Sequence, residues 1–258
     1  MMLHDRLYLR RRRDRGWRSS YQAGRLTREL ALQTGYEQVA QLTRKLEAHT
    51  GSSLATRHAL DFGCGWGRVA LPLAERCEHV YGLDIAPSVL QEAERNARKM
   101  NVSNVEWLDS GKLAELSGRY DLVISMFVFQ HIPVREGERI LAMLVEGLRV
   151  GGIGAIQLVL RPSDPWAQLF RWVTSSAPPR DDKSMPVADG SENTVPVRRR
   201  SRLQAMRRYR HMLVGSYSLD RLGRLLADCG VAHWRVDFAR ANAWSRSFDA
   251  VTIIFAKN

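Results

Sequence analysis

Hydrophobic and polar residues follow two different patterns along this chain of 258 residues. Between residues 25 and 48, leucines and a valine recur at roughly helical spacing, with an interruption at Thr34-Gly35. We therefore predict one or two helices in this segment. From residue 57 onward, short apolar runs alternate with amphipathic stretches, which is typical of parallel strands joined by crossover helices.

The short apolar runs predict seven strands, two of them close to the C-terminus. Ser218 is a suitable N-cap for the last helix, and Gly230 is a suitable stop signal. The strands are expected over residues 58–62, 79–83, 105–108, 120–125, 153–160, 231–239 and 248–256, and the helices over about 67–77, 87–100, 135–148 and 219–229.

The first predicted strand leads directly into three glycines at alternate positions, Gly63, Gly65 and Gly67. Glycines are needed where the backbone turns sharply and approaches a ligand. The second strand ends in Asp84, at the position where a carboxylate can bind the hydroxyls of a ribose. The pair predicts a site for an adenosine-type ligand. The alternative is a simple tight turn, with Asp84 capping the helix that begins at Pro87.

The glycine spacing narrows the class of nucleotide. Dehydrogenases that bind dinucleotides favour G-x-G-x-x-G, whereas this turn reads G-x-G-x-G and is preceded by Asp61. A carboxylate here would repel a pyrophosphate but attract an ammonium group. A ligand with adenosine at one end and an amino acid at the other fits best, so an oxidoreductase is the least favoured function.

The run from Asp61 to Gly67 resembles motif I of the class I S-adenosylmethionine-dependent methyltransferases, and Leu83-Asp84-Ile85 resembles their ribose-binding motif. The resemblance covers residues 57–160 and, more loosely, 217–257. It implies an α/β, Rossmann-like, mostly parallel sheet of seven strands in the order 3-2-1-4-5-7-6, with helices on both faces. N-terminal helices and a cap insertion would be added to this core.

The same resemblance assigns roles beyond the glycine turn. An acid at the end of the third strand, here Asp109, commonly accepts a hydrogen bond from the adenine amino group, although Asp109 could instead cap the next helix. Residues 126–133 resemble the motif IV region of small-molecule methyltransferases. Within it, His131 is a candidate general base or substrate-orienting residue. The alternative is that His131 caps the following turn and packs behind the cofactor.

S-adenosylmethionine is therefore the expected cofactor, with S-adenosylhomocysteine as the product. No metal is expected, because no cluster of metal ligands is evident. The expected cofactor-binding residues are Asp61, Phe62, Gly63, Cys64, Gly65, Gly67, Arg68, Asp84, Ile85, Asp109, Ser110, Met126 and Gln130.

Charge divides the chain into segments. The net charge is +12. The arginine-rich residues 1–30 and 195–212 together have a net positive charge slightly larger than this total, so the other residues are near neutral. We predict a basic flexible arm over 1–24, a helical segment over 25–56 and a methyltransferase domain over 57–258, in which 161–216 forms an inserted cap or substrate region. The arginine-rich segments 6–28 and 198–210 could contact nucleic acid, acidic lipid or a phosphorylated substrate. A solvated surface is the alternative.

The three cysteines have no paired spacing, and no apolar run approaches the roughly 20 residues that span a bilayer. Both observations favour a cytoplasmic protein. The predicted function is methyl transfer to an O or N atom of a small molecule, such as a sugar or glycolipid intermediate. The segment after the fourth strand lacks the Asn/Asp-Pro-Pro-Tyr/Phe sequence of nucleic-acid amino methylation. An RNA methyltransferase and a catalytically silent interaction protein are the alternatives, and the oligomeric state is open.

Overall fold

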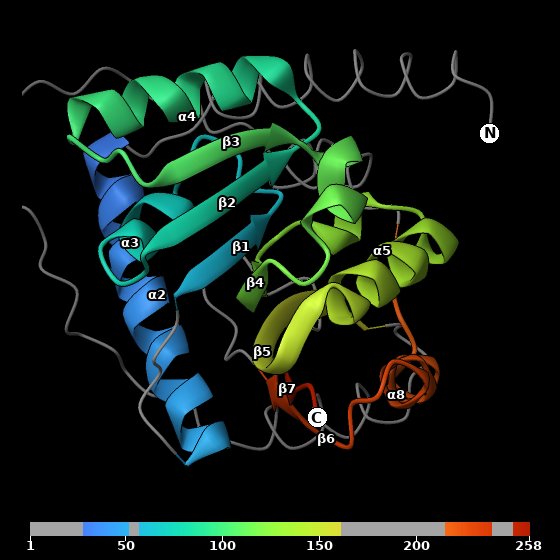
Figure 1. Ribbon diagram of the computed structural model, residues 1–258. Helices are drawn as coiled ribbons and strands as arrows, with labels where there is room; N and C mark the ends of the chain where they lie inside the picture. The colour runs from blue at the N-terminus through green and yellow to red at the C-terminus, as the bar shows by residue number, and fades with distance from the viewer. Residues whose placement is uncertain (1–27, 52–56, 161–214, 239–249) are drawn as a thin grey trace, which may run out of the picture.

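The computed structural model describes residues 28–51, 57–160, 215–238 and 250–258, and these residues form an α/β fold around one sheet (Figure 1). The seven strands lie in the order β3-β2-β1-β4-β5-β7-β6, which confirms the predicted order. β7 is antiparallel to β5 and β6, and the other neighbouring strands are parallel. The strands are β1 (His58–Phe62), β2 (His79–Asp84), β3 (Val105–Asp109), β4 (Tyr120–Ser125), β5 (Leu148–Val159), β6 (His233–Phe238) and β7 (Ala250–Ala256).

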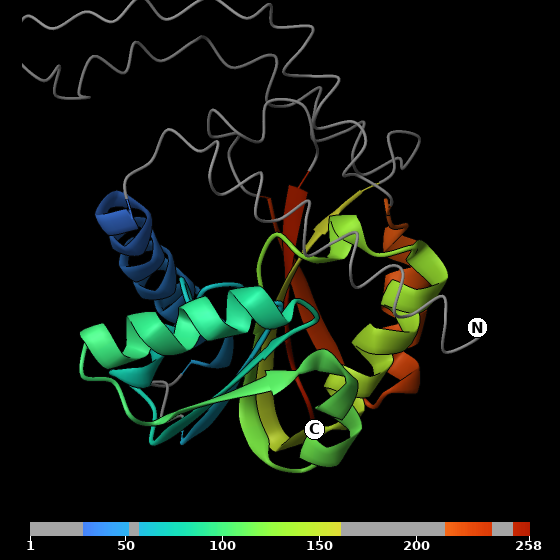
Figure 2. The same cartoon turned by 90° about the horizontal axis from the view of Figure 1, so that it is seen from above.

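Helices cover both faces of the sheet, as predicted (Figure 2). Both faces of the central strands are therefore buried, which explains their nearly continuous apolar sequences. Leu60 and Phe62 belong to the core beneath α5 and α8, whereas Ala59 belongs to the core beneath α2 and α3. The helices are α2 (Arg28–Thr50), α3 (Ala70–Ala74), α4 (Pro87–Lys99), α5 (Val134–Glu146) and α8 (Leu219–Asp228), with short 3-10 helices η1 (Ser110–Leu116) and η2 (Phe129–His131).

Helix α2 corrects the predicted interruption at Thr34-Gly35, because it runs unbroken through both residues. Gly35 is buried, and a Cβ atom at this position would lie 2.1 Å from the carbonyl oxygen of Arg68. The glycine therefore does not break the helix but lets it approach the backbone of the glycine turn. This contact joins two segments that are far apart in the sequence, so local helix propensity could not indicate it.

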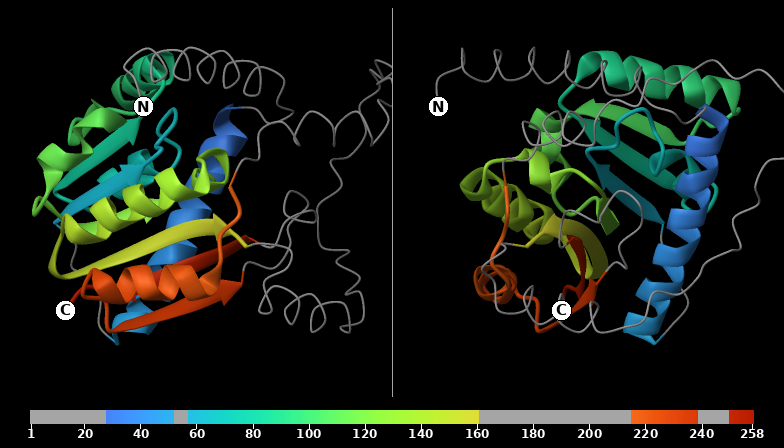
Figure 3. Two further views of the ribbon diagram at one scale, coloured as in Figure 1. Left: turned by 90° about the vertical axis from the view of Figure 1, so that its right-hand side faces the viewer. Right: turned by 180° about the vertical axis from the view of Figure 1, so that it is seen from behind.

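Helix α2 is also anchored at other points along its length. In the first half of α2, the Tyr36 hydroxyl donates a hydrogen bond to Glu75. Towards its C-terminal end, Lys45 forms an ion pair with Asp237 of β6, and Arg235 Nη2 donates to the Lys45 carbonyl oxygen at 2.6 Å. Figure 3 shows α2 running across the side of the sheet that it covers. The helix is thus attached both to the segment after α3 and to the edge strand.

Other element boundaries also differ from the prediction, most clearly at the starts of α3 and β5. α3 begins at Ala70 rather than near residue 67, because Gly67 has a left-handed φ of 93° that an α-helix cannot contain. β5 begins at Leu148 rather than 153, and an irregularity in its pairing with β4 lies between Tyr120 and Leu122. Ser218 occupies the N-cap position of α8 but makes no capping hydrogen bond through its side chain.

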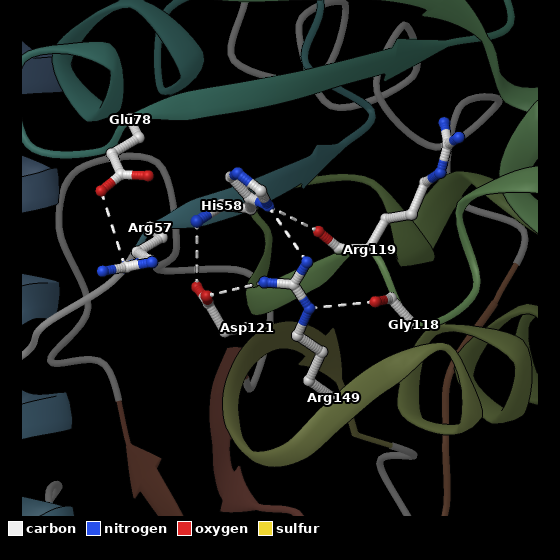
Figure 4. Close-up of polar contacts among 7 residues, drawn as sticks. All are labelled: Arg57, His58, Glu78, Gly118, Arg119, Asp121 and Arg149. Atoms are coloured by element: carbon white, nitrogen blue, oxygen red, sulfur yellow. Dashed lines mark hydrogen bonds and ion pairs between the residues drawn. The ribbon is translucent and has the colours of Figure 1, made fainter.

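The amino ends of β1, β4 and β5 are joined by a polar cluster (Figure 4). Asp121 accepts a hydrogen bond from the His58 amide at 3.1 Å and pairs with Arg149 Nη1 at 3.4 Å. Arg149 Nε donates to the Gly118 carbonyl oxygen at 2.9 Å, and its Nη2 lies 3.2 Å from His58 Nδ1. This cluster lies at the opposite ends of the strands from the glycine turn, so we interpret its role as stabilising the fold.

Several predictions fall on residues outside the described ranges. These are the basic arm 1–24, most of the cap region 161–216, and the arginine-rich segments except for Arg28. The division of the chain into these segments stays a prediction, as does its cytoplasmic location. Among the described helices, none is long and apolar enough to cross a membrane.

Candidate functional site

The candidate site lies at the carboxyl ends of β1, β2, β3 and β4. The strand order changes direction at β1, which pairs with β2 on one side and β4 on the other, and such a switch point is where open α/β sheets bind ligands. The register places Asp84 opposite Asp109, and Asp61 opposite Ile124 near the end of β4. The structure therefore brings the predicted segments after all four strands to one edge.

The glycine turn is held tightly against the end of β2. The amides of Gly63 and Cys64 both donate to the carbonyl oxygen of Leu83, at 2.7 and 2.9 Å. All three glycines have left-handed φ angles, of 77°, 57° and 93° for Gly63, Gly65 and Gly67. Cys64 is buried, and burial raises the pKa of its thiol well above the usual value. We therefore expect Cys64 to act by packing and not as a nucleophile.

Asp84 connects the glycine turn to the start of α4. Its Oδ2 accepts a hydrogen bond from the Gly65 amide at 3.0 Å, and its Oδ1 accepts one from the Ala86 amide at 2.9 Å. The alternative predicted for this residue, a cap for the helix that begins at Pro87, is wrong: the N-cap of α4 is Ala86, without a capping hydrogen bond from its side chain, and Asp84 holds the amide of Ala86 ahead of the helix. Carboxylate oxygens can each accept more than one hydrogen bond, so the same geometry is compatible with ribose hydroxyls.

Asp61 is a buried and incompletely satisfied acid at this edge. It is 2% exposed, and its Oδ2 has no hydrogen-bond partner. Burial raises its pKa to about 7, the positive charge of Arg68 acts in the opposite direction, and the charge of Asp84 adds to the rise. Buried polar atoms normally have partners. An orphaned carboxylate oxygen beside a glycine turn is therefore a fitting contact for a ligand's ammonium group.

Arg68 links three parts of the structure. Its Nη1 donates to Gln38 Oε1 of α2 at 2.5 Å, and its guanidinium carbon lies 5.6 Å from the centre of the Phe127 ring. The turn, helix α2 and the segment after β4 thus meet at this side chain. Arg68 is expected in the site from the sequence, whereas Gln38 and Phe127 are not. Phe127 lies within residues 126–133, which resemble motif IV, but no local pattern marks Gln38 as part of a site.

Asp109 and Ser110 follow β3 as predicted. Asp109 is the N-cap of η1, where its Oδ1 accepts a hydrogen bond from the Gly111 amide at 2.9 Å. The capping role that we left open is therefore present. The contact of Asp109 with an adenine amino group stays a prediction.

The segment after β4 carries Met126, Gln130 and His131. Met126 packs against the core beneath α2 and α3, and Gln130 is buried within η2. His131 is half-buried at the end of η2, and its amide donates to the Val128 carbonyl oxygen at 2.9 Å. The structure thus places His131 in a defined turn at the site edge. Its role as a base stays a prediction.

Two buried polar side chains in this region were missed. Ser125 Oγ donates to the Phe62 carbonyl oxygen at 2.8 Å and so joins the ends of β4 and β1. Gln157 Oε1, on β5, accepts the amide of Phe127 at 3.0 Å. Both are polar residues inside apolar strand runs. Because a buried polar side chain needs a hydrogen-bond partner, this pattern in the sequence could have indicated that the two residues make specific contacts. Within the described residues, no group of three or more His, Cys, Asp or Glu could hold a metal ion.

A switch-point site with a glycine turn and two acids defines a Rossmann-like domain for an adenosine-type ligand. Residues 59–152 match the family model of a methyltransferase domain. Together with the fold, this match shows that the chain contains a domain of the class I S-adenosylmethionine-dependent methyltransferases. The family predicted from the glycine turn is confirmed.

The curated relatives are O-methyltransferases. The ubiquinone biosynthesis O-methyltransferase of Rickettsia akari is 30% identical over 132 residues, which cover 49% of this chain and 49% of the relative. The magnesium-protoporphyrin O-methyltransferase of Synechocystis is 35% identical over 85 residues, covering 33% of this chain and 37% of the relative. The chain thus matches about half or less of the length of these relatives.

Solved structures share the fold at low identity. The magnesium protoporphyrin IX methyltransferase of Synechocystis with bound SAH has a TM-score of 0.60 at 19% identity, covering 98% of both chains. The N-methyltransferase NodS of Bradyrhizobium japonicum, in complex with S-adenosylhomocysteine, has a TM-score of 0.52 at 14% identity, covering 86% of both chains. At these identities the likeness concerns the fold alone.

Proposed function

We propose that this protein transfers a methyl group from S-adenosylmethionine to an oxygen atom of a small organic molecule. The observation that carries the cofactor assignment is the buried Asp61 carboxylate with an orphaned Oδ2 beside the glycine turn. The choice of oxygen as the acceptor atom is supported by the curated relatives, which are named as O-methyltransferases.

The residues at the edge fit the parts of this cofactor. Asp61 would hold the ammonium of the methionyl end, and Arg68 the carboxylate. Asp84 would bind the ribose hydroxyls, and Asp109 with Ser110 would bind the adenine. When bound, the sulfonium supplies an activated methyl group.

Besides binding the cofactor, the protein must align the acceptor with the methyl group and exclude water. An alcohol or phenol must also lose its proton, and His131 is the residue that we propose for this step. It follows β4 directly, at the same sheet edge as Asp61 and Asp84. An imidazole can accept a proton near neutral pH, which suits this role.

The acceptor is a small molecule in this proposal. The relatives' names refer to ubiquinone biosynthesis and to magnesium protoporphyrin, so planar unsaturated acceptors should be tested first. The sugar or glycolipid acceptor expected from the segment after β4 stays a prediction. The RNA alternative rests on arginine-rich segments of which all but Arg28 lies outside the described residues.

Calorimetric titration of the full chain with S-adenosylmethionine, and separately with NADH, tests the cofactor assignment. We expect micromolar affinity for the sulfonium cofactor alone, and loss of that affinity in Asp84→Ala. Asp121→Ala is a matched control, because it removes an acid from the opposite edge of the sheet. Binding of NADH without S-adenosylmethionine would refute the proposal.

Transfer of a radiolabelled methyl group to a panel of phenols, carboxylic acids, sugars and amines then tests the acceptor atom. We expect label in O-methyl products of the phenols or acids. Label only in the amines would contradict the choice of oxygen.

A further inference from the structure

The turn after β4 contains a residue in a strained backbone conformation. Phe127 has a φ of 63°, and the other non-glycine residue with a positive φ in the described ranges is Asn101, at 55°. Asparagine tolerates the left-handed region because its short side chain can hydrogen-bond locally, whereas a bulky aromatic residue is an outlier there. Such strain persists only where the surrounding structure enforces it, and it concentrates at functional sites.

A buried glutamine helps to enforce this conformation. Gln157 lies on β5, is 5% exposed, and accepts the Phe127 amide at 3.0 Å. Its neighbours Ile156 and Leu158 are fully buried apolar residues of the same strand. Because a polar side chain in such a strand is costly unless it is hydrogen-bonded, Gln157 and the Phe127 amide depend on each other.

Core packing does not account for the conformation of Phe127. Its side chain is 37% exposed and belongs to none of the three core clusters of the described residues. Its ring lies against the Arg68 guanidinium, whose central carbon is 5.6 Å from the ring centre. This distance is within the range of a cation–π interaction.

The Arg68 guanidinium also contacts helix α2, where Gln38 Oε1 accepts a hydrogen bond from its Nη1 at 2.5 Å. The guanidinium is thus held between α2 on one side and the turn after β4 on the other. It is near enough to Asp61 for its positive charge to favour ionisation of that carboxyl group. A fixed cation beside a buried, incompletely satisfied carboxylate presents two opposite charges at one edge of the sheet.

We propose that Phe127, held by Gln157, is a positioning residue that fixes Arg68 beside Asp61, so that the two charges match the zwitterionic methionyl end of the cofactor. This inference rests on the proposed function. It explains why a strained aromatic residue and a buried glutamine occur together at this edge. It also assigns Gln157, which lies on β5 outside every predicted motif, to cofactor binding.

The test compares S-adenosylmethionine with 5′-methylthioadenosine, which has the same adenosine but a neutral thioether in place of the sulfonium and no amino-acid end. Calorimetry would measure both affinities for the chain of residues 1–258 without substitutions and for Phe127→Leu, Phe127→Gly and Gln157→Met. We expect about fivefold weaker binding of S-adenosylmethionine in all three variants, the size of one exposed cation–π contact, and unchanged binding of 5′-methylthioadenosine. Phe127→Tyr, which keeps an aromatic ring, should bind S-adenosylmethionine with the same affinity as the wild-type protein.

Phe127→Gly keeps the test valid if other variants fold poorly, because glycine adopts a positive φ without strain. We expect its thermal unfolding midpoint to rise while its affinity for S-adenosylmethionine falls. Asn101→Gly is the matched control: it places glycine at the other described non-glycine residue with a positive φ, next to the C-terminal end of α4, and should leave both affinities unchanged.

The outcomes separate this inference from the proposed function. If the wild-type protein does not bind S-adenosylmethionine, the proposed function fails. If it binds and the Phe127 and Gln157 variants bind equally well, the inference fails while the function stands. Equal weakening of both ligands would indicate a purely structural role and would also overturn the inference.

Discussion

A Cβ atom on Gly63 would lie 2.2 Å from Cγ2 of Val128, in the segment after β4. Gly63 also has a left-handed φ of 77°. The first glycine of the turn is therefore needed for two reasons that involve no ligand, its conformation and its contact with the neighbouring loop. Ser125 Oγ, which donates to the Phe62 carbonyl oxygen, joins the same two segments one residue earlier on β1.

We predict that Gly63→Ala lowers the free energy of unfolding by about 3 kcal/mol, from left-handed strain and from overpacking. Val128→Ala removes the two methyl groups that the new Cβ would strike, so the double variant should recover about half of that loss. Denaturant unfolding of all four proteins measures the coupling. Strictly additive effects would show that the Val128 contact does not limit this position.

Gly35→Ala should destabilise the protein, although glycine to alanine normally stabilises a helix by about 1 kcal/mol. The reason is the Arg68 carbonyl oxygen, 2.1 Å from the position of the new Cβ, which as a backbone atom cannot turn aside. We expect a loss of about 2 kcal/mol in chemical unfolding. Gln33→Ala, at an exposed position of the same helix, should be neutral or stabilising. A stabilised Gly35→Ala variant would show that α2 does not pack closely on the turn.

Asp61 should make folding stability depend on pH. Its pKa is raised from 3.8 to about 7 in the folded protein, chiefly by burial, so the folded state binds the extra proton more tightly than the unfolded state. The free energy of unfolding should therefore fall as pH rises from about 4 to about 7 and then level off, by up to ~4 kcal/mol.

Asp61→Asn does not titrate and should lose this decline, whereas Asp121→Asn, at the opposite edge, should keep it. Chemical unfolding across this pH range measures both. A decline of the same size in Asp61→Asn would assign the effect to another group.

The same carboxyl group should control cofactor affinity. A ligand ammonium favours the ionised form of Asp61, so affinity for S-adenosylmethionine should weaken up to tenfold for each pH unit below about 7. Calorimetry between pH 5.5 and pH 7 checks this, with 5′-methylthioadenosine, which carries no amino group of that kind, as the pH-independent control ligand. Equal pH dependence for both ligands would place the titrating group elsewhere.

The polar cluster at the amino ends of the strands should affect stability alone. Asp121→Ala removes the acceptor of the His58 amide and the partner of Arg149, both visible in Figure 4. We expect a loss of 1–2 kcal/mol, about the cost of a half-buried hydrogen-bonded acceptor, measured by thermal or chemical unfolding. Affinity for S-adenosylmethionine should be unchanged, and a large change in it would mean that the two edges of the sheet are coupled.

Local sequence patterns identified most of the strands and the core of the candidate site. β4 coincides with its predicted range, and the glycine turn, Asp84 and Asp109 all lie at the expected edge. These features depend on short-range properties, namely the alternation of apolar runs, glycine spacing and acids at strand ends. The wrongly predicted interruption of α2 depends on a non-local contact, because Gly35 resembles a helix breaker until the approach of Arg68 is known.

The sequence by itself therefore determined the α/β class, the methyltransferase family and the acids of the adenosine-type site. The class follows from the alternation of apolar runs and amphipathic stretches, and the family and the acids follow from spacing within short segments. Only the tertiary structure decided how Gln38, Arg68, Phe127 and Gln157 meet, since the two hydrogen bonds in this chain of contacts each join residues 30 positions apart. It also revealed that Asp61 Oδ2 is buried without a partner. Contacts of this kind arise from the packing of separate elements, and no local pattern of hydrophobic and polar residues encodes them.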